Sequence, residues 1–424
     1  MLTMTSKIKK LHFVALLIGL MCISAKSKAR DIEVSRDGAV QNITEALKIA
    51  HKGDRIVVHK GIYASNQITV NKSVIITGEK GAILDGQNKY QIMVITADSV
   101  TVKNLTFRNV GISYLDDNAA IKLKDVSHCR IINNTLKNVF FGIYLLKTKN
   151  SYISKNSITG NGQQEVSSGG GIHLHSCDHI TITRNKVRHS RDGIYFEFVD
   201  NSDIRNNVSE HNIRYGLHLM YSDHNSFSFN TFRDNQAGGV VMYSNFVTIK
   251  HNNFLHNWGS NNDGLLLKEF NDGLVEQNRF YKNSSAVYSE GSNRIKFDHN
   301  NFVQNGWAAK IMSNCTKNEF IKNNFIENTF DVSTSGSTNL NSFDKNYWSS
   351  YKGYDLNRDG NGDVPYHPVS MFSYLVNQYK PSIILMRSIF IRFLSIAEKV
   401  MPVLTPKTLV DHKPLMHQVT IAMK

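Results

Sequence analysis

Residues 247–254 read Val-Thr-Ile-Lys-His-Asn-Asn-Phe, a short alternating run followed by Asn252 and, two positions later, Phe254. The same phrase, an Asn followed two residues later by an apolar residue, occurs ten times at intervals clustered around 22 residues. The pairs are Asn134/Leu136, Asn156/Ile158, Asn185/Val187, Asn206/Val208, Asn230/Phe232, Asn252/Phe254, Asn278/Phe280, Asn300/Phe302, Asn323/Phe325 and Asn346/Trp348. A fixed period in this range is typical of a solenoid, in which each repeat buries its apolar face only against its neighbours.

Each repeat is expected to hold at least two strands. Alternating runs such as Ile180-Thr-Ile-Thr have the two-residue period of a strand with one buried and one wet face. A second strand, led by a glycine as in Gly171-Ile-His-Leu, precedes each Asn by about 14 residues. We therefore predict an all-β protein: a single-stranded right-handed parallel β-helix, pectate-lyase-like, with about 22–23 residues per coil. With strands about 4.8 Å apart, roughly eleven coils would form a rod about 50 Å long.

Both ends of a solenoid need a cover, because the terminal coils expose apolar faces and unpaired strand edges. Near the start, residues 42–50 carry apolar side chains at helical spacing, which predicts a short cap helix with Asn42 or Thr44 as its N-cap. The repeat stops at about residue 350, and all six prolines follow it. We expect the β-helix to span residues 30–350, an Asp/Asn/Gly-rich loop region residues 351–380, and an amphipathic helical tail residues 381–424.

The first 29 residues have the order of a secretory signal peptide. Three lysines are followed by the apolar run Leu11 to Ile23 and then by small residues. Cleavage after Ala25 or Ala29 would release an exported mature chain. A lipidated Cys22 is an alternative, and an uncleaved anchor is disfavoured by the short apolar run.

Composition narrows the function classes. Residues 1–29 hold five lysines and no acids, so the net charge of the mature chain is (49 − 5) − 35 = +9. An exported basic chain without a recognition motif favours an acidic partner, a polyanionic sugar or a membrane surface, not nucleic acid. Cys129, Cys177 and Cys315 are too few and too widely spaced for a disulfide framework. No phosphate-binding loop, zinc-protease motif or nucleophile elbow occurs, and we predict no enzyme.

The glycine-led strands carry the residues that point to metal chemistry. Alternate positions of these strands are expected to face outward, and one such column reads His175, Glu197, Met220 and Met242 in four successive coils. Neighbours in the column would stand about 4.8 Å apart, a span that two side chains can bridge through one ion. His and Met are soft ligands suited to copper(I). A packing role, or an adaptable apolar docking surface, is the alternative for the methionines.

A second candidate site lies in the loop region. Carboxylate and amide oxygens alternate around a glycine, as in the first half of a calcium loop, at Asp355, Asn357, Asp359 and Asp363. Tyr366 stands where such a loop would place its bidentate Glu, so a hydrogen-bonded Asx-rich turn is the alternative to bound calcium.

The tail beyond the loop region is apolar but interrupted by charges. Residues 383–403 could form a membrane-surface helix or a helix docked on a partner or on the last coil. The charges within this stretch make a simple membrane-spanning helix a poor expectation.

Three features together resemble the NosD family of nitrous oxide reductase maturation proteins. They are the exported β-helix, the paired coils RYGLHLMYS (214–222) and QAGGVVMYS (236–244), and the tail from Asn346-Tyr-Trp through Gly-Tyr-Asp-Leu-Asn-Arg-Asp-Gly-Asn-Gly-Asp-Val-Pro-Tyr-His-Pro to 411–416, Asp-His-Lys-Pro-Leu-Met. The resemblance covers essentially the whole mature chain, although the coil repeats are weakly specific and the tail is the more particular part.

The resemblance implies a periplasmic protein that binds and hands over copper(I) during maturation of nitrous oxide reductase. It implies an ABC transporter partner, made of an ATPase and a membrane subunit, and a copper chaperone lipoprotein as donor. The membrane surface or the membrane subunit would be met through residues 381–403. The ligands it favours are His218, Met220 and Met242, followed by His175 and His173.

Two alternatives remain at the level of sequence. One is an exported polysaccharide lyase, epimerase or sugar-binding β-helix, and the other is a metal-free scaffold for the transporter. A lyase needs a base and a charge-neutralising cluster on one face. The charged residues Asp192, Asp263, Glu197, Glu269 and Lys268 are instead scattered among His and Met.

Overall fold

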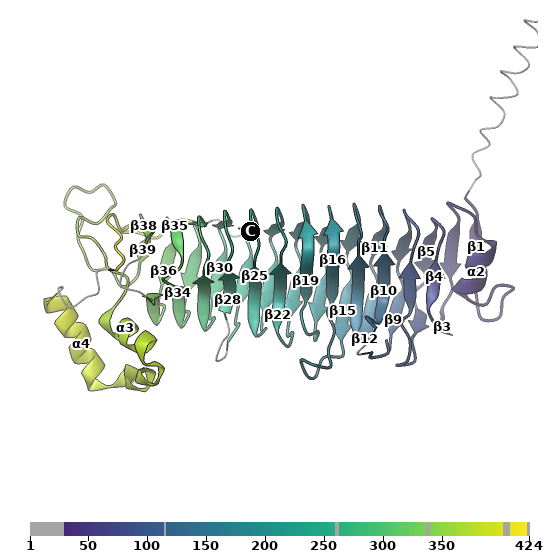
Figure 1. Cartoon of the computed structure of the whole chain (residues 1–424), viewed down its shortest axis with the longest axis horizontal. Coiled ribbons are helices and arrows are strands. Elements are labelled where there is room, and N and C mark those ends of the chain that lie inside the picture. The colour runs from purple at the N-terminus through teal and green to yellow at the C-terminus, as the bar shows by residue number, and fades with distance from the viewer. Residues whose placement is uncertain (1–28, 114–115, 259–262, 336–339, 402–407, 422–424) are drawn as a thin grey trace, which may run out of the picture.

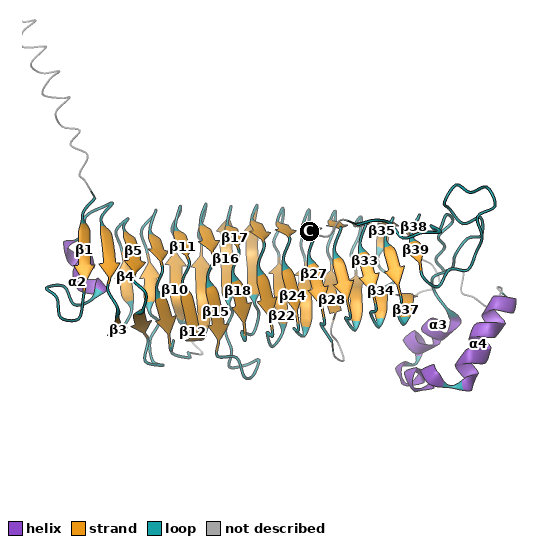
Figure 2. Cartoon of the chain, turned by 180° about the vertical axis from the view of Figure 1, so that it is seen from behind, coloured by secondary structure: helices purple, strands orange, loops and turns teal. Residues whose placement is uncertain are grey.

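The chain winds into a right-handed parallel β-solenoid of about 13 turns. The computed structural model describes residues 29–113, 116–258, 263–335, 340–401 and 408–421. Three parallel sheets of 14, 13 and 12 strands, here called sheets A, B and C, run the length of the rod. Figure 1 shows the strands side by side along the rod, and Figure 2 shows the same stack from behind. The predicted right-handed parallel β-helix is confirmed.

The strands are short and follow one another in a fixed cycle from sheet C to sheet A to sheet B. Sheet A holds β1 (Asp31–Val34), β2 (Arg55–Val58), β5 (Ile75–Gly78), β8 (Thr101–Lys103), β11 (Arg130–Ile132), β14 (Tyr152–Ser154), β17 (Thr181–Thr183), β20 (Asp203–Arg205), β23 (Ser226–Ser228), β26 (Thr248–Lys250), β29 (Leu274–Glu276), β32 (Lys296–Asp298), β35 (Thr316–Ile321) and β38 (Leu340–Asp344). Sheet B holds β3 (Gly61–Ala64), β6 (Ala82–Asp85), β9 (Thr106–Arg108), β12 (Thr135–Val139), β15 (Ser157–Gly160), β18 (Lys186–Arg188), β21 (Val208–Glu210), β24 (Thr231–Arg233), β27 (Asn253–Leu255), β30 (Arg279–Tyr281), β33 (Asn301–Val303), β36 (Asn324–Ile326) and β39 (Tyr347–Trp348). Sheet C holds β4 (Ile68–Val70), β7 (Met93–Ile95), β10 (Ala119–Lys124), β13 (Phe141–Leu146), β16 (Ile172–Asp178), β19 (Ile194–Asp200), β22 (Tyr215–Met220), β25 (Ala237–Met242), β28 (Asp263–Lys268), β31 (Ser285–Glu290), β34 (Trp307–Ile311) and β37 (Phe330–Thr334).

The expected number of coils, roughly eleven, is too low. The turns built from β1 to β9 precede Asn134 and lack the repeated Asn phrase. A count based on that phrase therefore misses them.

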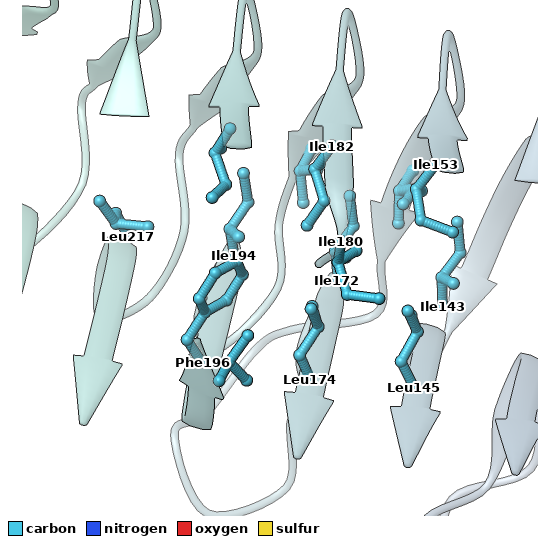
Figure 3. Close-up of a cluster of buried hydrophobic side chains, with 14 of the residues drawn as sticks. Ile143, Leu145, Ile153, Ile172, Leu174, Ile180, Ile182, Ile194, Phe196 and Leu217 are labelled. Carbon is cyan, nitrogen blue, oxygen red and sulfur yellow. The ribbon is translucent and has the colours of Figure 1, made fainter. Parts of the chain in front are cut away.

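The interior is filled by apolar side chains that align from coil to coil. On sheet C, Ile172 lies opposite Ile194, which lies opposite Leu217. Figure 3 shows these side chains and Leu174 together in the interior of the solenoid. Toward the C-terminal end the interior becomes aromatic, and a continuous ring stack with centroids 4.0–5.4 Å apart runs through Phe232, Phe254, Phe280, Phe302, Phe325 and Trp348.

The repeated asparagines form a buried hydrogen-bonded ladder between sheets A and B. In each coil the backbone N–H and the side-chain Nδ2 donate to Oδ1 of the next Asn, at 2.8–3.1 Å. The members are Asn134, Asn156, Asn185, Asn207, Asn230, Asn252, Asn278, Asn300, Asn323 and Asn346. Because a buried amide without partners is costly, this ladder fixes the register of every coil that it joins.

One of the ten predicted Asn/apolar pairs, Asn206/Val208, is wrong by one residue. Asn207, not Asn206, occupies the ladder, and Asn206 is exposed in the left-handed backbone region at φ 57°. The two neighbouring asparagines made the register ambiguous, and Val208 fits the apolar position of the phrase. The structure instead buries Ser209 there, whose hydroxyl donates to the Gly216 carbonyl.

The predicted N-terminal cap helix is confirmed as α2 (Ile43–Ile49). Asn42 is its N-cap and accepts from the Glu45 N–H, while a Glu45 carboxylate oxygen accepts from the Gln41 N–H. Ile43, Ala46 and Leu47 are buried in the core of the first coils. The Lys72 ammonium donates to helix-terminal carbonyls, including that of Leu47 at 2.7 Å, where a cation complements the helix dipole.

The C-terminal helices pack on the last coils. They are α3 (Met371–Gln378), the 3-10 helix η1 (Lys380–Arg387) and α4 (Ile389–Val400). Phe372 of α3 lies against Phe330 of β37, with ring centroids 5.7 Å apart, and Ile391 of α4 joins the same apolar cluster. Figure 1 shows this helical group as a projection at the far end of the rod.

The tail differs from the expected helical segment over residues 381–424. Helical structure begins earlier, at Met371, and residues 408–421 are extended rather than helical. This last segment runs back over the final coil and forms parallel bridges between Phe343 and Asp411 and between Tyr347 and Leu415. Its backbone and the Asp411 side chain form hydrogen bonds with the last coils, which a helix with internally paired backbone could not do.

Asp411 completes the Asn ladder. Its Oδ2 accepts from the N–H and Nδ2 of Asn346 at 3.0 and 3.1 Å and from the indole Nε1 of Trp348 at 3.0 Å. The carboxylate therefore occupies the place that the next Asn side chain would take.

The predicted signal peptide lies outside the described residues, except for its last position, Ala29. In the part of the chain that the structure describes, no helix is long and apolar enough to cross a membrane.

Candidate functional site on sheet C

The predicted column of His, Glu and Met exists on the outer face of sheet C. His175 pairs in register with Glu197, Glu197 with Met220, and Met220 with Met242. All four side chains are half-buried. His175 Nδ1 lies 3.2 Å from Glu197 Oε2, so the carboxylate already engages this imidazole. We call these four residues the outer column.

A second column lies two residues earlier on the same strands, and we call it the inner column. It consists of Tyr144, His173, Tyr195, His218 and Val240, paired in that order. The alternation of the strand predicts a wet face here, but the structure buries all five. His173 and His218 are only 9% and 6% exposed.

Aromatic rings enclose the two inner histidines. The His173 ring is stacked on Tyr144 at 4.7 Å and lies 4.5 Å from Tyr195. His218 meets Tyr195 and Tyr215 edge to face, at 4.7 and 5.1 Å. Burial, helped by the nearby Arg191 charge, lowers the pKa of His173 to about 3. His173 is therefore neutral, which is the form of imidazole that binds metal ions.

A charged network covers the His218 end of the inner column. Asp192, 1% exposed, lies 3.9 Å from His218 Nδ1, and its carboxylate is 3.3 and 3.8 Å from the guanidinium Nε atoms of Arg191 and Arg214. Arg214 also reaches Glu165 at 3.2 Å, on the long connection between β15 and β16. Burial raises the pKa of Asp192, but His218 and the two arginines outweigh it and the net direction is downward.

The sequence did not reveal this network. The sequence places Asp192 among scattered charges, yet the coils bring it beside His218 from the turn between β18 and β19. Glu165 lies in a connection without periodicity, so no repeat pattern could have placed it near Arg214.

Several buried polar atoms of the inner column and of the neighbouring Asp192 have no hydrogen-bond partner among the described residues. They are both ring nitrogens of His218, Nδ1 of His173 and Oδ1 of Asp192. The 3.9 Å between His218 and Asp192 exceeds a normal hydrogen bond. Buried polar atoms are normally paired with protein, water or an ion. The ring nitrogens of His218 are therefore available to coordinate a metal ion.

The five predicted ligands fall into two groups. Met220 and Met242 are adjacent, and His218 lies on the same face as Met220, two residues earlier on β22. His173 and His175 lie on β16, and β19 stands between them and β22. Two strand spacings amount to about 9.6 Å. One ion could thus be held by His218, Met220 and Met242, while His173 and His175 would need a second position.

The described ranges contain no cluster of the common metal-binding side chains. No group of three or more His, Cys, Asp or Glu side chains there is arranged to hold a metal ion. Cys129, Cys177 and Cys315 are all free and buried. A soft-metal site on sheet C would therefore rely on the Met thioethers together with His218.

Aromatic rings border the outer column, two of them exposed and that of Tyr243 half-buried. Phe198, Tyr221 and Tyr243 directly follow Glu197, Met220 and Met242 and stack on one another with centroids 5.3 and 5.0 Å apart. All three have positive φ, between 50 and 54°. The same turn conformation recurs along the rod, so these three rings project in register beside the methionines.

The predicted calcium loop forms a compact turn. Asp355 Oδ2 accepts from the Gly360 N–H at 2.9 Å, and Asp359 Oδ1 from the Asn361 N–H at 2.8 Å. Asn357 and Asp363 likewise accept from backbone amides, at 3.0 and 2.7 Å. This bonding matches an Asx-rich turn. Calcium binding by this loop stays a prediction.

Large exposed apolar side chains gather on η1 and α4, in the helical group at the C-terminal end. We define this surface by the exposed residues Ile383, Ile384, Leu385, Met386, Ile389, Phe390, Phe393 and Ile396, and call it the tail face. Ile384 is 84% exposed and Phe393 67%. Contiguous exposed apolar residues of this size are typical of interaction sites.

Two family models match the sequence. The family described as "Periplasmic copper-binding protein (NosD)" matches residues 156–359, which contain the whole outer column. The family described as "Right handed beta helix region" matches residues 90–170.

Two relatives carry the same name, "Probable ABC transporter binding protein NosD". The protein from Stutzerimonas stutzeri is 27% identical, with 82% of this chain and 84% of the relative covered. The protein from Pseudomonas aeruginosa is 28% identical, with 88% of this chain and 90% of the relative covered. The predicted resemblance to NosD is thereby confirmed.

Solved structures support the fold alone. The catalytic unit of a GH87 alpha-1,3-glucanase from Streptomyces thermodiastaticus superposes with a TM-score of 0.60 at 11% identity, covering 76% of this chain and 69% of that one. A mutant of the periplasmic alginate epimerase AlgG gives a TM-score of 0.53 at 12% identity, covering 68% of this chain and 76% of that one.

Proposed function

This chain is NosD-like, and from that premise we propose that it binds copper(I) on the outer face of sheet C and hands it over during maturation of nitrous oxide reductase. The family match gives copper binding in the periplasm as its coarse function. The oxidation state of the ion, its residues and its transfer are our proposals.

The observation that carries the proposal is the register of Met220 with Met242. Adjacent parallel strands hold the two thioethers at the same level of neighbouring coils, about 4.8 Å apart at the backbone. Copper(I) accepts two or three soft ligands, and an imidazole nitrogen is a suitable third. His218 fits this role because both of its ring nitrogens lack a partner in the described structure.

The environment of the pair suits a carrier rather than a permanent metal centre. Met220 and Met242 are half-buried, so a partner could approach them from solvent. A site of two thioethers and one imidazole offers no anionic ligand, which keeps binding reversible. We propose a copper chaperone lipoprotein as donor and nitrous oxide reductase as the final recipient.

We propose that the tail face docks on the membrane subunit of an ABC transporter. The relatives' printed name, ABC transporter binding protein, supports this assignment, as does the exposed apolar character of η1 and α4. The protein would then be membrane-associated through its partner, with the ATPase subunit across the membrane. Membrane lipid itself is the competing occupant of the same face.

We propose that the protein acts as a binding protein and not as an enzyme. A sugar lyase or epimerase would need its base and its charge-neutralising group open to a polymer. The cluster that comes nearest, Asp192 with His218 and Arg214, is buried beneath the Glu165 connection, with Asp192 only 1% exposed.

The test is a copper(I) titration of the purified chain against a chromophoric chelator under anaerobic conditions. The native protein is expected to remove about one equivalent of copper from the chelator. The Met220→Leu/Met242→Leu variant should lose at least about tenfold in affinity, because both thioethers are gone. Leu keeps nearly the same volume, so packing on sheet C is preserved.

Met312→Leu is the matched control, since Met312 is also half-buried and follows β34 at the corresponding position of sheet C. It should bind copper like the native protein. Equal affinity of the double variant and the native protein would move the site away from the outer column. No binding by any of the three would favour the metal-free scaffold.

A further inference from the structure

A row of histidines lies at another edge of the solenoid, where the strands of sheet B end. His189 follows β18, His211 follows β21, Asp234 follows β24 and His256 follows β27. The preceding residues Arg188, Glu210, Arg233 and Leu255 are paired in register, so the four turn residues stand in successive coils. All four side chains are exposed.

The backbone aims these side chains in a common direction. Each of the four residues has positive φ, between 53 and 54°. The identical turn repeats at the strand spacing of about 4.8 Å. Neighbouring side chains in this row therefore project from the corner side by side and in the same direction.

The pair His189/His211 has the arrangement of a chelating site. The two imidazole rings are stacked with an interplanar angle of 15° and centroids 6.0 Å apart. On its other side, His211 Nε2 lies 3.9 Å from Asp234 Oδ2. At 3.9 Å this contact is longer than a hydrogen bond, so Asp234 acts here as a nearby negative charge, and His211 Nδ1, on the other side of the ring, is left as a metal donor.

We propose that His189 and His211 form a second metal site, which takes a borderline divalent transition-metal ion such as Cu²⁺ or Zn²⁺. Imidazole nitrogens suit these ions and bind them at about 2.0–2.1 Å. A small rotation of the two exposed rings brings one nitrogen from each to a common ion. Water would fill the remaining positions, and Asp234 would stay nearby as a negative charge.

The other turn histidines do not repeat this arrangement. His224 is stacked on Phe246 at 4.9 Å, and His251 on Phe229 at 4.7 Å. Each of these histidines has a phenylalanine in the adjacent coil where His189 has His211. They are exposed or half-buried imidazoles of the same turn type and serve as matched controls.

The site is separate from the proposed copper(I) site in both place and chemistry. It lies on the corner after sheet B, whereas Met220 and Met242 lie at the far end of the sheet C strands. Thioethers bind copper(I) and are poor ligands for Cu²⁺ or Zn²⁺. The two sites can therefore fail or succeed independently.

The experiment is a titration of the mature chain with Cu²⁺, followed by continuous-wave electron paramagnetic resonance, together with calorimetric Zn²⁺ binding. At one equivalent of Cu²⁺, the spectrum of the native protein should show two imidazole nitrogens. His189→Gln and His211→Gln should each leave one nitrogen and weaken binding at least about tenfold, because chelation by two linked ligands is lost. Met220→Leu/Met242→Leu should leave the spectrum unchanged.

His224→Gln and His251→Gln should bind Cu²⁺ and Zn²⁺ like the native protein. The proposal is overturned if the His211→Gln variant keeps the native affinity and spectrum. It is also overturned if all four histidine variants lose binding in small equal steps, which would mean adventitious binding to surface histidines only.

Discussion

Asn207 is tied into the ladder by bonds on both sides. Its N–H and Nδ2 donate to Asn230 Oδ1 at 2.9 and 3.0 Å, and its own Oδ1 accepts from the N–H and Nδ2 of Asn185 at 2.9 and 3.0 Å. The residue is 1% exposed, so water cannot replace these partners. Its neighbour Asn206 is exposed and contributes mainly a left-handed turn conformation.

Asn207→Ala is expected to lower the free energy of unfolding by about 2–4 kcal/mol, because buried donors of Asn185 lose their acceptor. Asn206→Gly should change it by less than about 1 kcal/mol, since glycine accepts positive φ without strain. Urea unfolding followed by circular dichroism would measure both. An equal loss in the two variants would contradict the ladder position assigned to Asn207.

Single residues also mark how far the sequence could predict the site. The outer column was predictable because alternation and a repeat of about 22 residues together fix which side chains become neighbours. The burial of His173 and His218 could not be predicted in this way. Tyr144 and Tyr195 pack against these two imidazole rings, and the Arg214–Glu165 ion pair lies over the His218 end of the column. Glu165 lies in a connection whose path no periodicity defines.

At the scale of elements, Tyr366 connects strand β37 to the C-terminal segment, and its partner on β37 is the buried acid Asp331. Asp331 Oδ2 accepts from the Tyr366 hydroxyl at 3.0 Å, and Tyr366 pairs by its backbone with Asp411. Burial raises the pKa of Asp331 to about 7, and the bond from Tyr366 offsets only part of this effect. Near neutral pH the folded protein therefore holds a proton that the unfolded chain, with an ordinary Asp pKa of about 3.9, has released.

This difference gives stability a definite dependence on pH. Between about pH 4 and 7 the folded state binds one more proton than the unfolded state at this residue, so the free energy of unfolding falls as the pH rises, by roughly 1 kcal/mol for each pH unit. Asp331→Asn should remove this contribution and flatten the change in urea midpoint between pH 5 and 7. Asp263, whose pKa burial raises to about 6, contributes in the same direction and remains in the variant. An unchanged pH dependence in Asp331→Asn would show that Asp331 is ionised in the folded protein.

Elements were predictable to different degrees. The strands and α2 follow from two-residue and helical periods that their own residues carry. The path of residues 408–421 does not, because it depends on the open edge of the last coil, where Asp411 takes up the ladder. The sequence showed an apolar stretch in the tail, but only the fold shows that residues 408–421 return to the last coils after it.

As a whole, the molecule is a rod with its features separated along the length and around the circumference. The strands of the outer column, β16, β19, β22 and β25, lie near the middle of the stack, and α4 with the tail face lies at the C-terminal end (Figure 1). The His189/His211 pair lies on the corner after sheet B. A repeating coil holds such sites in fixed register, since each turn is bonded to the next along three sheets. The rod would thus present metal to one partner while another holds its end.

Replacing three exposed apolar residues of the tail face, Ile384, Phe390 and Phe393, by Ser should weaken binding to a purified ATPase–membrane subunit complex at least about tenfold, because such anchors carry much of an interface's energy. Thermal stability should hardly change, as these side chains are 57–84% exposed. Biolayer interferometry with the complex and with lipid vesicles would separate protein docking from membrane binding.

The control for this variant replaces three exposed apolar residues of other loops, Ile112, Val166 and Trp258, by Ser. It should bind the complex like the native protein. Equal binding by the tail variant would exclude the tail face as the docking surface, and loss of vesicle binding alone would assign that face to lipid.

Asp411 has a consequence for the order in which the molecule can be made. The coils bond to their sequence neighbours and can form progressively from the N-terminal end. The last rung is different, because Asn346 and Trp348 find their acceptor 65 and 63 residues later in the chain. Until Asp411 is in place, the last coil ends in an open edge where the N–H and Nδ2 of Asn346 have no acceptor from this chain's ladder. Another chain could pair with that edge. We therefore expect a chain that lacks residues 408–421 to associate with other chains through this edge. The complete chain closes the edge with its own Asp411.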